Sequence, residues 1–86
     1  MPHYVYIIQS ESSGVLYKGY TAYPGLRLAE HNSGKSRYTA GKGPWKLVYL
    51  EKLSDKTTAL KRENQLKRAN SAFIKWLLEQ ESNLVK

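Results

Sequence analysis

The chain has 86 residues and a mass of 9.9 kDa, with 41% hydrophobic residues and no cysteine. A chain of this length supports one hydrophobic core, so we expect a single domain spanning 1–86, its core at about 3–78. The lack of cysteine excludes disulfide scaffolds, thiol nucleophiles and zinc sites built on thiolates. Its apolar runs are too short to cross a bilayer, and we expect a soluble, cytoplasmic protein with no membrane partner.

The charge is strongly basic. Fourteen Lys and Arg oppose seven Asp and Glu, which gives +7 at pH 7 and a pI near 9.7. Such an excess predicts a polyanionic partner, most commonly nucleic acid, although a solubilised basic surface is the alternative. Because two histidines and seven carboxylates are the remaining metal-binding groups, a metal site would be rich in oxygen and suited to Mg²⁺ or Mn²⁺.

The first half of the chain predicts a hairpin followed by a helix. Residues 3–9 are β-branched and aromatic, which favours a strand, and Val15–Thr21 predicts a second strand. The short polar loop Ser10–Gly14 between them makes an antiparallel hairpin the expected connection. Pro24 fits the first turn of a helix, and Asn32-Ser33-Gly34 is a stop signal.

The second half predicts one more strand and two helices. Residues 34–44 combine glycines with basic side chains, and we expect a mobile basic loop there. Trp45–Leu53 predicts a third strand. Ser54 or Asp55 can cap a helix that runs to about Ala69.

A last helix completes the order β-β-α-β-α-α. Asn70 or Ser71 can cap it, and it extends through about Glu81. With a hairpin first and no room for a long parallel array, we expect an α/β (α+β) fold in which helices flank a small three-stranded antiparallel sheet.

The helix from Pro24 to Asn32 separates its residues into two sides. On a helical wheel its apolar residues face its charged or titratable ones: Leu26, Leu28 and Ala29 against Glu30, Arg27 and His31. Arg27 and His31 are neighbours at i,i+4. A solvated face explains this pair, but a planar cation beside an imidazole also suits a reaction at phosphate.

Glu63 lies within the apolar arc of the next helix, among Ala59, Leu60 and Leu66. A carboxylate that projects toward a core is costly unless it is paired or binds a cation. Two interpretations remain open: an ion pair with a lysine or arginine from elsewhere, or a single carboxylate ligand for a divalent ion.

The tyrosines are numerous, seven in the chain, and several lie in the predicted hairpin. Strand alternation puts Tyr4 and Tyr6 on one face, and Tyr17 on the same face of its strand as Gly19. Depending on register, Tyr6 and Tyr17 come close together, although ordinary packing also explains them. A glycine inside a strand, such as Gly19, often marks the close approach of a ligand or another backbone.

In this order and spacing, these residues resemble the GIY-YIG nuclease superfamily. Val5-Tyr6-Ile7 stands where the family has Gly-Ile-Tyr, and Tyr17-Lys18-Gly19 where it has Tyr-Ile-Gly. Arg27 matches the motif arginine, His31 the His/Tyr position one turn later, and Glu63 the metal-binding glutamate. Three further segments are similar to small stand-alone (UPF0213-like) members: Ser33-Gly34-Lys35, Tyr38-Thr39 and Leu47-Val48-Tyr49.

The resemblance implies a divalent-metal-dependent endonuclease that hydrolyses DNA phosphodiester bonds. Glu63 would hold one Mg²⁺ or Mn²⁺, and Arg27 would bind a non-bridging phosphate oxygen. Tyr17 or Tyr6 would position or deprotonate the attacking water, with His31 as the competing base or proton relay. The sequence leaves the choice among these three open. It also leaves open a non-catalytic module of the same fold that binds nucleic acid or a protein partner.

Basic residues supply the expected contacts with nucleic acid. The candidates for binding backbone phosphates are Lys18, Lys35, Arg37, Lys42 and Lys46. Because no base-reading motif is visible, we expect low sequence specificity, which leaves room for recognition of a DNA shape such as a branch or nick. The sequence leaves open whether the role lies in DNA repair, recombination or RNA processing. A protein partner could supply targeting.

Overall fold

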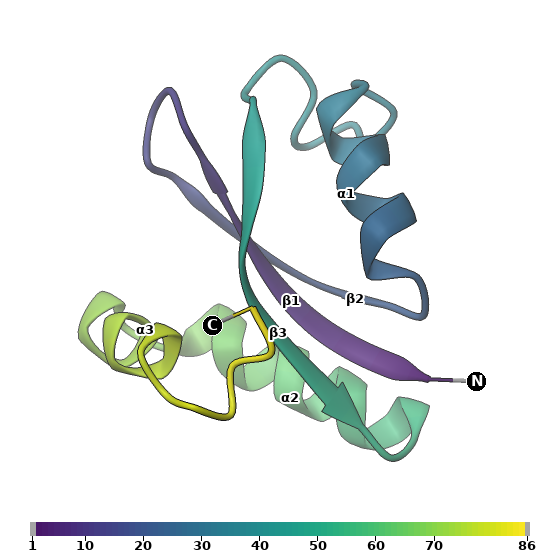
Figure 1. Ribbon diagram of the computed structural model, residues 1–86, viewed down its shortest axis with the longest axis vertical. Helices are drawn as coiled ribbons and strands as arrows, with labels where there is room; N and C mark the ends of the chain where they lie inside the picture. Colours follow the sequence, from purple (N-terminus) through teal and green to yellow (C-terminus); the bar gives the residue numbers. More distant parts are fainter. Residues whose placement is uncertain (1, 86) are drawn as a thin grey trace.

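The computed structural model describes residues 2–85, which form three strands and three helices (Figure 1). In chain order they are β1 (His3–Ser10), β2 (Leu16–Thr21), α1 (Pro24–Asn32), β3 (Trp45–Leu53), α2 (Lys56–Arg68) and α3 (Ser71–Leu78). The strands form one antiparallel sheet in the order β2-β1-β3, so the predicted fold class is confirmed. None of the helices within the described residues is long and apolar enough to cross a bilayer.

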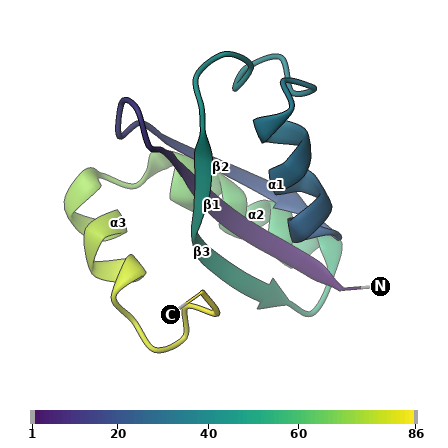
Figure 2. The same ribbon diagram turned by 45° about the horizontal axis from the view of Figure 1, so that its top comes forward.

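β1 is the central strand and is buried on both faces. Val5 and Ile7 pack into a cluster with α2 and α3, whereas Tyr6 and Ile8 pack with Trp45 and Leu28 on the opposite face. The helices are divided accordingly, with α1 on one side of the sheet and α2 and α3 on the other (Figure 2). Burial on both faces explains why β1 is a continuous apolar and aromatic run instead of an alternating one.

The helix boundaries follow from side chains that bind the free backbone groups. Asp55 accepts a hydrogen bond from the Thr58 N–H at 2.8 Å, and Asn70 accepts one from the Phe73 N–H at 2.8 Å. α3 ends at Leu78, earlier than the predicted Glu81. The amide of the buried Asn83 donates to the Leu78 carbonyl at 3.0 Å, which provides a partner for this helix end.

The orientation of α1 differs from the wheel-based expectation. His31 is only 1% exposed and faces the sheet, whereas Leu26 is 60% exposed. A solvated face is therefore the wrong explanation for His31. The polar side can be buried because both ring nitrogens of His31 have hydrogen-bond partners, so neither nitrogen is left unpaired.

The loop between α1 and β3 is anchored at several points, contrary to the expectation of a mobile segment. The Asn32 side chain bonds both the N–H and the carbonyl of Trp45, at 2.6 and 3.0 Å. The indole of Trp45 donates to the Thr39 carbonyl at 3.1 Å, and the Ser10 hydroxyl donates to the Lys42 carbonyl at 2.7 Å. These bonds place Thr39 over the face of the sheet that α1 covers.

Candidate active site

The site is organised around Tyr6, which lies at the middle of β1 directly opposite Gly19 of β2. A Cβ atom at Gly19 would lie only 2.5 Å from Tyr6 Cζ and closer still to the hydroxyl. The Tyr6 ring therefore lies across the backbone of Gly19, and only glycine leaves room for it. A close approach at Gly19 was expected, but the group that approaches is the side chain of Tyr6.

Tyr6 begins a buried chain of hydrogen bonds. Its hydroxyl is 2.8 Å from Nε2 of His31, and Nδ1 of His31 is 2.7 Å from the Thr39 hydroxyl. The three side chains come from β1, α1 and the loop before β3. His31 and Thr39 are fully buried or nearly so, and Tyr6 is only 2% exposed. Two partners on opposite ring nitrogens hold the imidazole in one orientation.

The protonation states in this chain follow from burial. Burial lowers the pKa of His31, and the nearby Arg27 charge lowers it further, so the imidazole is neutral at pH 7. Burial raises the pKa of Tyr6 to about 12 despite the opposing influence of Arg27, so the phenol keeps its proton. Because the phenol keeps its proton and the imidazole is neutral, the Tyr6 hydroxyl can donate to Nε2 of His31.

Arg27 lies beside this series of hydrogen bonds and is held there by a residue of its own helix. Its Nη1 lies 3.1 Å from Oε1 of Glu30, and both side chains are about one-third exposed. Although partial burial opposes it, hydrogen bonding with Glu30 and Tyr6 raises the pKa of Arg27, so the charge is permanent. Arg27 is thus a partly exposed cation close enough to influence the Tyr6 hydroxyl, and an anion could bind there.

Tyr17 lies on the same face of the sheet as Tyr6. Its ring centroid is 6.4 Å from that of Tyr6 and 5.1 Å from that of His31, which it meets edge-on at 60°. The paired register of β1 and β2, with Ile8 opposite Tyr17, produces this proximity. The fold thus brings together four of the residues predicted from the sequence: Tyr6, Tyr17, Arg27 and His31.

Glu63 is only 18% exposed, in keeping with its place in the sequence pattern of α2. Ala59 and Leu66 are the buried residues of that helix, whereas Leu60 is 41% exposed and does not belong to the buried face. The carboxylate pairs with Lys67 at 3.3 Å, a partner one turn along the same helix and not a cation from another element. Its negative charge makes a minor contribution to the raised pKa of Tyr6, from a helix on the opposite side of the sheet from α1.

Glu63 is suited to a magnesium ion but cannot enclose one. No group of three or more His, Cys, Asp or Glu side chains that could hold a metal occurs among residues 2–85. Mg²⁺ commonly takes one or two carboxylates and completes its shell with water and substrate phosphate. A single partly buried carboxylate fits that pattern, provided that Lys67 gives way.

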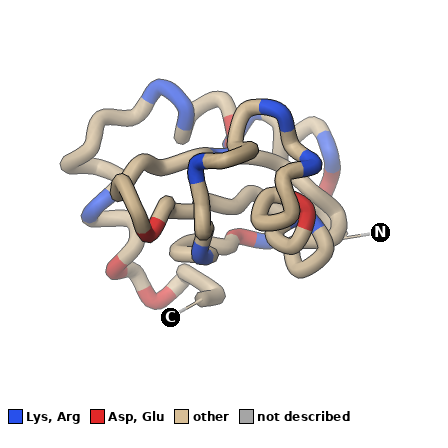
Figure 3. Tube along the Cα trace, turned by 90° about the horizontal axis from the view of Figure 1, so that it is seen from above, with Lys and Arg blue, Asp and Glu red and all other residues tan. Residues whose placement is uncertain are grey.

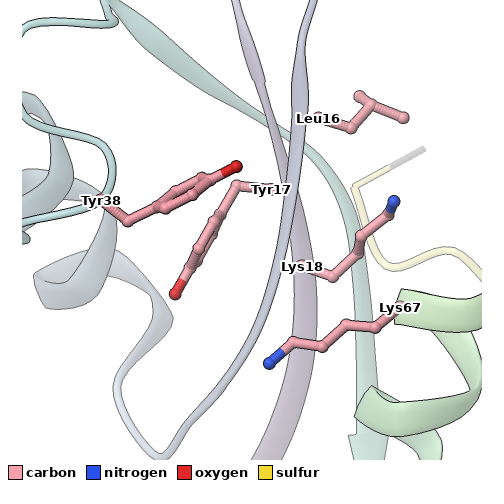
Figure 4. Close-up of a pocket in the computed structure, with 5 residues that line it drawn as sticks. All are labelled: Leu16, Tyr17, Lys18, Tyr38 and Lys67. Carbon is pink, nitrogen blue, oxygen red and sulfur yellow. The ribbon is translucent and has the colours of Figure 1, made fainter.

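The predicted phosphate-binding residues do not form one patch. Lys18 lines a pocket with Leu16, Tyr17, Tyr38 and Lys67 (Figure 4). Lys42 lies near this pocket, with its Nζ 4.2 Å from the centre of the Tyr38 ring. Basic positions continue along the loop between α1 and β3 (Figure 3), where Lys35 and Arg37 are exposed.

Lys46 is placed elsewhere. It lines a different cavity, at the turn between β1 and β2, together with Gln9, Ser10, Glu11 and Gly14. The structure therefore separates Lys46 from the other candidates.

Sequence reasoning missed Thr39 and Lys67. Thr39 is a loop residue without periodic neighbours, and its only signal was its place in a segment similar to the small family members. Its role depends on the Trp45 indole and the His31 imidazole, which contact it from outside the loop. Lys67 follows Glu63 by four residues, a spacing that indicates an ion pair on a helix.

Comparisons with known proteins agree with this arrangement. The model of the GIY-YIG catalytic domain matches residues 2–76. A UPF0213 protein of Natronomonas pharaonis is 37% identical over 81 residues, covering 93% of this chain and 94% of the relative. A UPF0213 protein of Syntrophus aciditrophicus is 42% identical over 80 residues, covering 91% of each chain. The solution NMR structure of the UPF0213 protein BH0048 from Bacillus halodurans superposes with a TM-score of 0.61 at 32% identity, covering 99% of this chain and 90% of that one. The chain therefore belongs to the GIY-YIG family and is similar to UPF0213 proteins over most of their length.

Proposed function

We propose that this protein is a divalent-metal-dependent endonuclease that hydrolyses phosphodiester bonds of DNA. The observation that supports this most directly is the buried chain from Tyr6 through His31 to Thr39, with Arg27 beside the Tyr6 hydroxyl. A buried phenol hydrogen-bonded to a neutral imidazole provides a path for a proton. A permanent cation at the same hydroxyl provides a place for a phosphate oxygen.

The proton path favours Tyr6 and His31 acting together. As water attacks phosphorus, the Tyr6 oxygen takes a proton from the water and passes its own proton to Nε2 of His31, 2.8 Å away. Because the pKa of Tyr6 is about 12, a free phenolate would be rare at neutral pH, and the neutral imidazole is what makes the transfer favourable. The Thr39 hydroxyl accepts the hydrogen on Nδ1 and holds the tautomer that leaves Nε2 free to accept.

Arg27 and Glu63 would stabilise charge on the scissile phosphate. Arg27 donates to a non-bridging oxygen and stabilises the charge that develops on it, while Glu30 holds the guanidinium in place. A divalent ion bound by Glu63 would neutralise the scissile phosphate and stabilise the leaving oxygen. Tyr17, edge-on to the imidazole, closes the side of the site and excludes water from His31.

We further propose a cytoplasmic role in DNA repair or recombination, with selection by DNA shape. The basic residues of the β2 edge and of the loop between α1 and β3 would contact backbone phosphates. Such contacts carry no base information. A branched or nicked substrate would therefore be chosen by its geometry, or by a protein partner that delivers the domain to it.

The test is nicking of supercoiled plasmid and branched DNA in Mg²⁺ or Mn²⁺, with EDTA, Glu63→Ala and Glu81→Ala alongside. Glu81 is an exposed carboxylate after α3, so its variant controls for the loss of one negative charge. We expect nicking that EDTA and Glu63→Ala abolish and Glu81→Ala retains, with DNA binding intact in both variants. The Glu63–Lys67 pair is half exposed on its lysine side, so its loss should lower stability by less than about 1 kcal/mol.

Absence of nicking on every substrate, with salt-sensitive DNA binding intact, would refute the enzyme and leave a binding module. Nicking by Glu63→Ala in proportion to its folded fraction would instead refute the metal-binding role of Glu63.

A further inference from the structure

The pocket at the β2 edge of the sheet combines an aromatic surface with a cationic one. β2 is an edge strand, and three consecutive residues of it line the pocket: Leu16, Tyr17 and Lys18. Because successive side chains of a strand point to opposite faces, Tyr17 and Lys18 line the pocket from the two sides of the sheet. Tyr38 joins the tyrosine side and Lys67 the lysine side, around a volume of about 280 Å³ (Figure 4).

The aromatic side of the pocket includes the exposed ring of Tyr38, which contacts two neighbouring side chains. Tyr38 is 59% exposed. It leans on Tyr17, with ring centroids 5.5 Å apart at 34°, and Lys42 lies over its ring at 4.2 Å. Contacts from two neighbours fix the ring before any ligand arrives, which reduces the entropy lost when a flat molecule stacks there.

The opposite side of the pocket is cationic. In Figure 4 the amines of Lys18 and Lys67 lie on the other side of the β2 edge from the two tyrosine rings. Within residues 2–85, the recorded ion pair at this side of the pocket joins Lys67 to Glu63. An aromatic surface and two amines on the two sides of one strand edge match the chemistry of a nucleotide, whose base stacks on aromatic rings and whose phosphate binds cations.

We infer that this pocket binds one unpaired nucleotide of the substrate, with its base against Tyr38 and its phosphate between Lys18 and Lys67. The inference rests on the proposed function and deepens it, because Tyr17 belongs both to the pocket and to the surroundings of His31, 5.1 Å away. The nucleotide next to the scissile bond is then unpaired. The substrate class is nucleic acid with a single-stranded segment at the cleavage point, since bases in an intact duplex stack on each other and are unavailable to Tyr38.

Binding in EDTA tests this without any cleavage. The probes are a labelled oligodeoxythymidine, a duplex of equal length, and an abasic strand of the same length, titrated by fluorescence anisotropy at two salt concentrations. Tyr38→Ala is compared with Tyr38→Phe and with Tyr23→Ala, a matched exposed tyrosine at the start of α1, outside the pocket. Lys18→Gln tests the cationic side.

Tyr38→Ala should weaken binding of oligodeoxythymidine by about 5- to 150-fold, as for loss of one stacked base, while Tyr38→Phe and Tyr23→Ala change it less than about twofold. Tyr38→Ala should not change the affinity for the abasic strand. Lys18→Gln should reduce the slope of log affinity against log salt by about 0.7 for the single strand.

Equal effects of Tyr38→Ala and Tyr23→Ala, or equal affinity of the wild type for single strand and duplex, would overturn the inference. An effect of Tyr38→Ala that persists on the abasic strand would also overturn it, because that contact would not involve a base. Tyr38-dependent binding by a protein that never nicks DNA would refute the nuclease alone and leave the nucleotide subsite in place.

Discussion

Replacement of Gly19 by alanine tests how tightly the site is built. The new Cβ would lie 2.5 Å from Cζ and 2.8 Å from Cε1 of Tyr6, whereas carbon atoms in contact are normally about 3.5–4.0 Å apart. The ring must therefore retreat by about 1 Å. Tyr6 is buried against Ile8 and Trp45, so the neighbours on the other side resist that movement.

Two costs contribute to the expected destabilisation. Overpacking a buried site costs about 1–3 kcal/mol. A retreat of this size also breaks the 2.8 Å bond to His31 and leaves a buried nitrogen without a partner, at about 1–3 kcal/mol. We expect the free energy of unfolding to fall by about 2–6 kcal/mol, a large part of the stability of a small domain.

Urea denaturation followed by circular dichroism measures this change. Gly25→Ala is the matched control, because a Cβ at that exposed helical position meets nothing within 4 Å. That control should be neutral or up to about 1 kcal/mol more stable than the wild type, since alanine favours helix. A loss below about 0.5 kcal/mol for Gly19→Ala would refute the contact between Gly19 and Tyr6.

Two further predictions concern the buried imidazole. Thr39→Val keeps the side-chain shape but leaves Nδ1 of His31 without its partner. We therefore expect the free energy of unfolding, measured by urea denaturation, to fall by about 1–3 kcal/mol and cleavage to slow. Unchanged stability and unchanged cleavage would refute the role of Thr39. Because burial lowers the pKa of His31, the unfolded chain binds a proton that the folded one does not, and stability should fall as pH drops below about 6.5. His31→Gln should flatten that pH dependence, and an identical slope in the variant would contradict a buried neutral imidazole.

The fold could be predicted well because its elements are signalled locally. β-Branched and aromatic runs marked all three strands, and one residue of each proposed capping pair, Asp55 and Asn70, is the cap that forms. The end of α3 was misplaced because its last carbonyl is bound by Asn83, five residues further on. A contact from outside the helix does not change the hydrophobic periodicity of the helix sequence.

The site was predictable as a set of residues but not as an arrangement. The sequence pattern put Tyr17 and Gly19 on one face of their strand but left the proximity of Tyr6 to the strand register, and the observed pairing brings the three together. The orientation of α1 was not predictable from its wheel. His31 is buried by partners from β1 and from a loop that lies eight residues further along the chain, and hydrophobic periodicity contains no information about such partners.

The most direct test of the account is the cleavage rate of Tyr6→Phe under single-turnover conditions, with a saturating divalent ion and a substrate that the wild type nicks. The variant keeps the ring that packs over Gly19 and removes only the hydroxyl that bonds His31. We expect DNA affinity within about twofold of the wild type and a cleavage rate lower by about 10²- to 10⁴-fold, the usual contribution of a group that moves a proton. Cleavage at the wild-type rate by folded Tyr6→Phe protein would contradict the proton path from Tyr6 to His31.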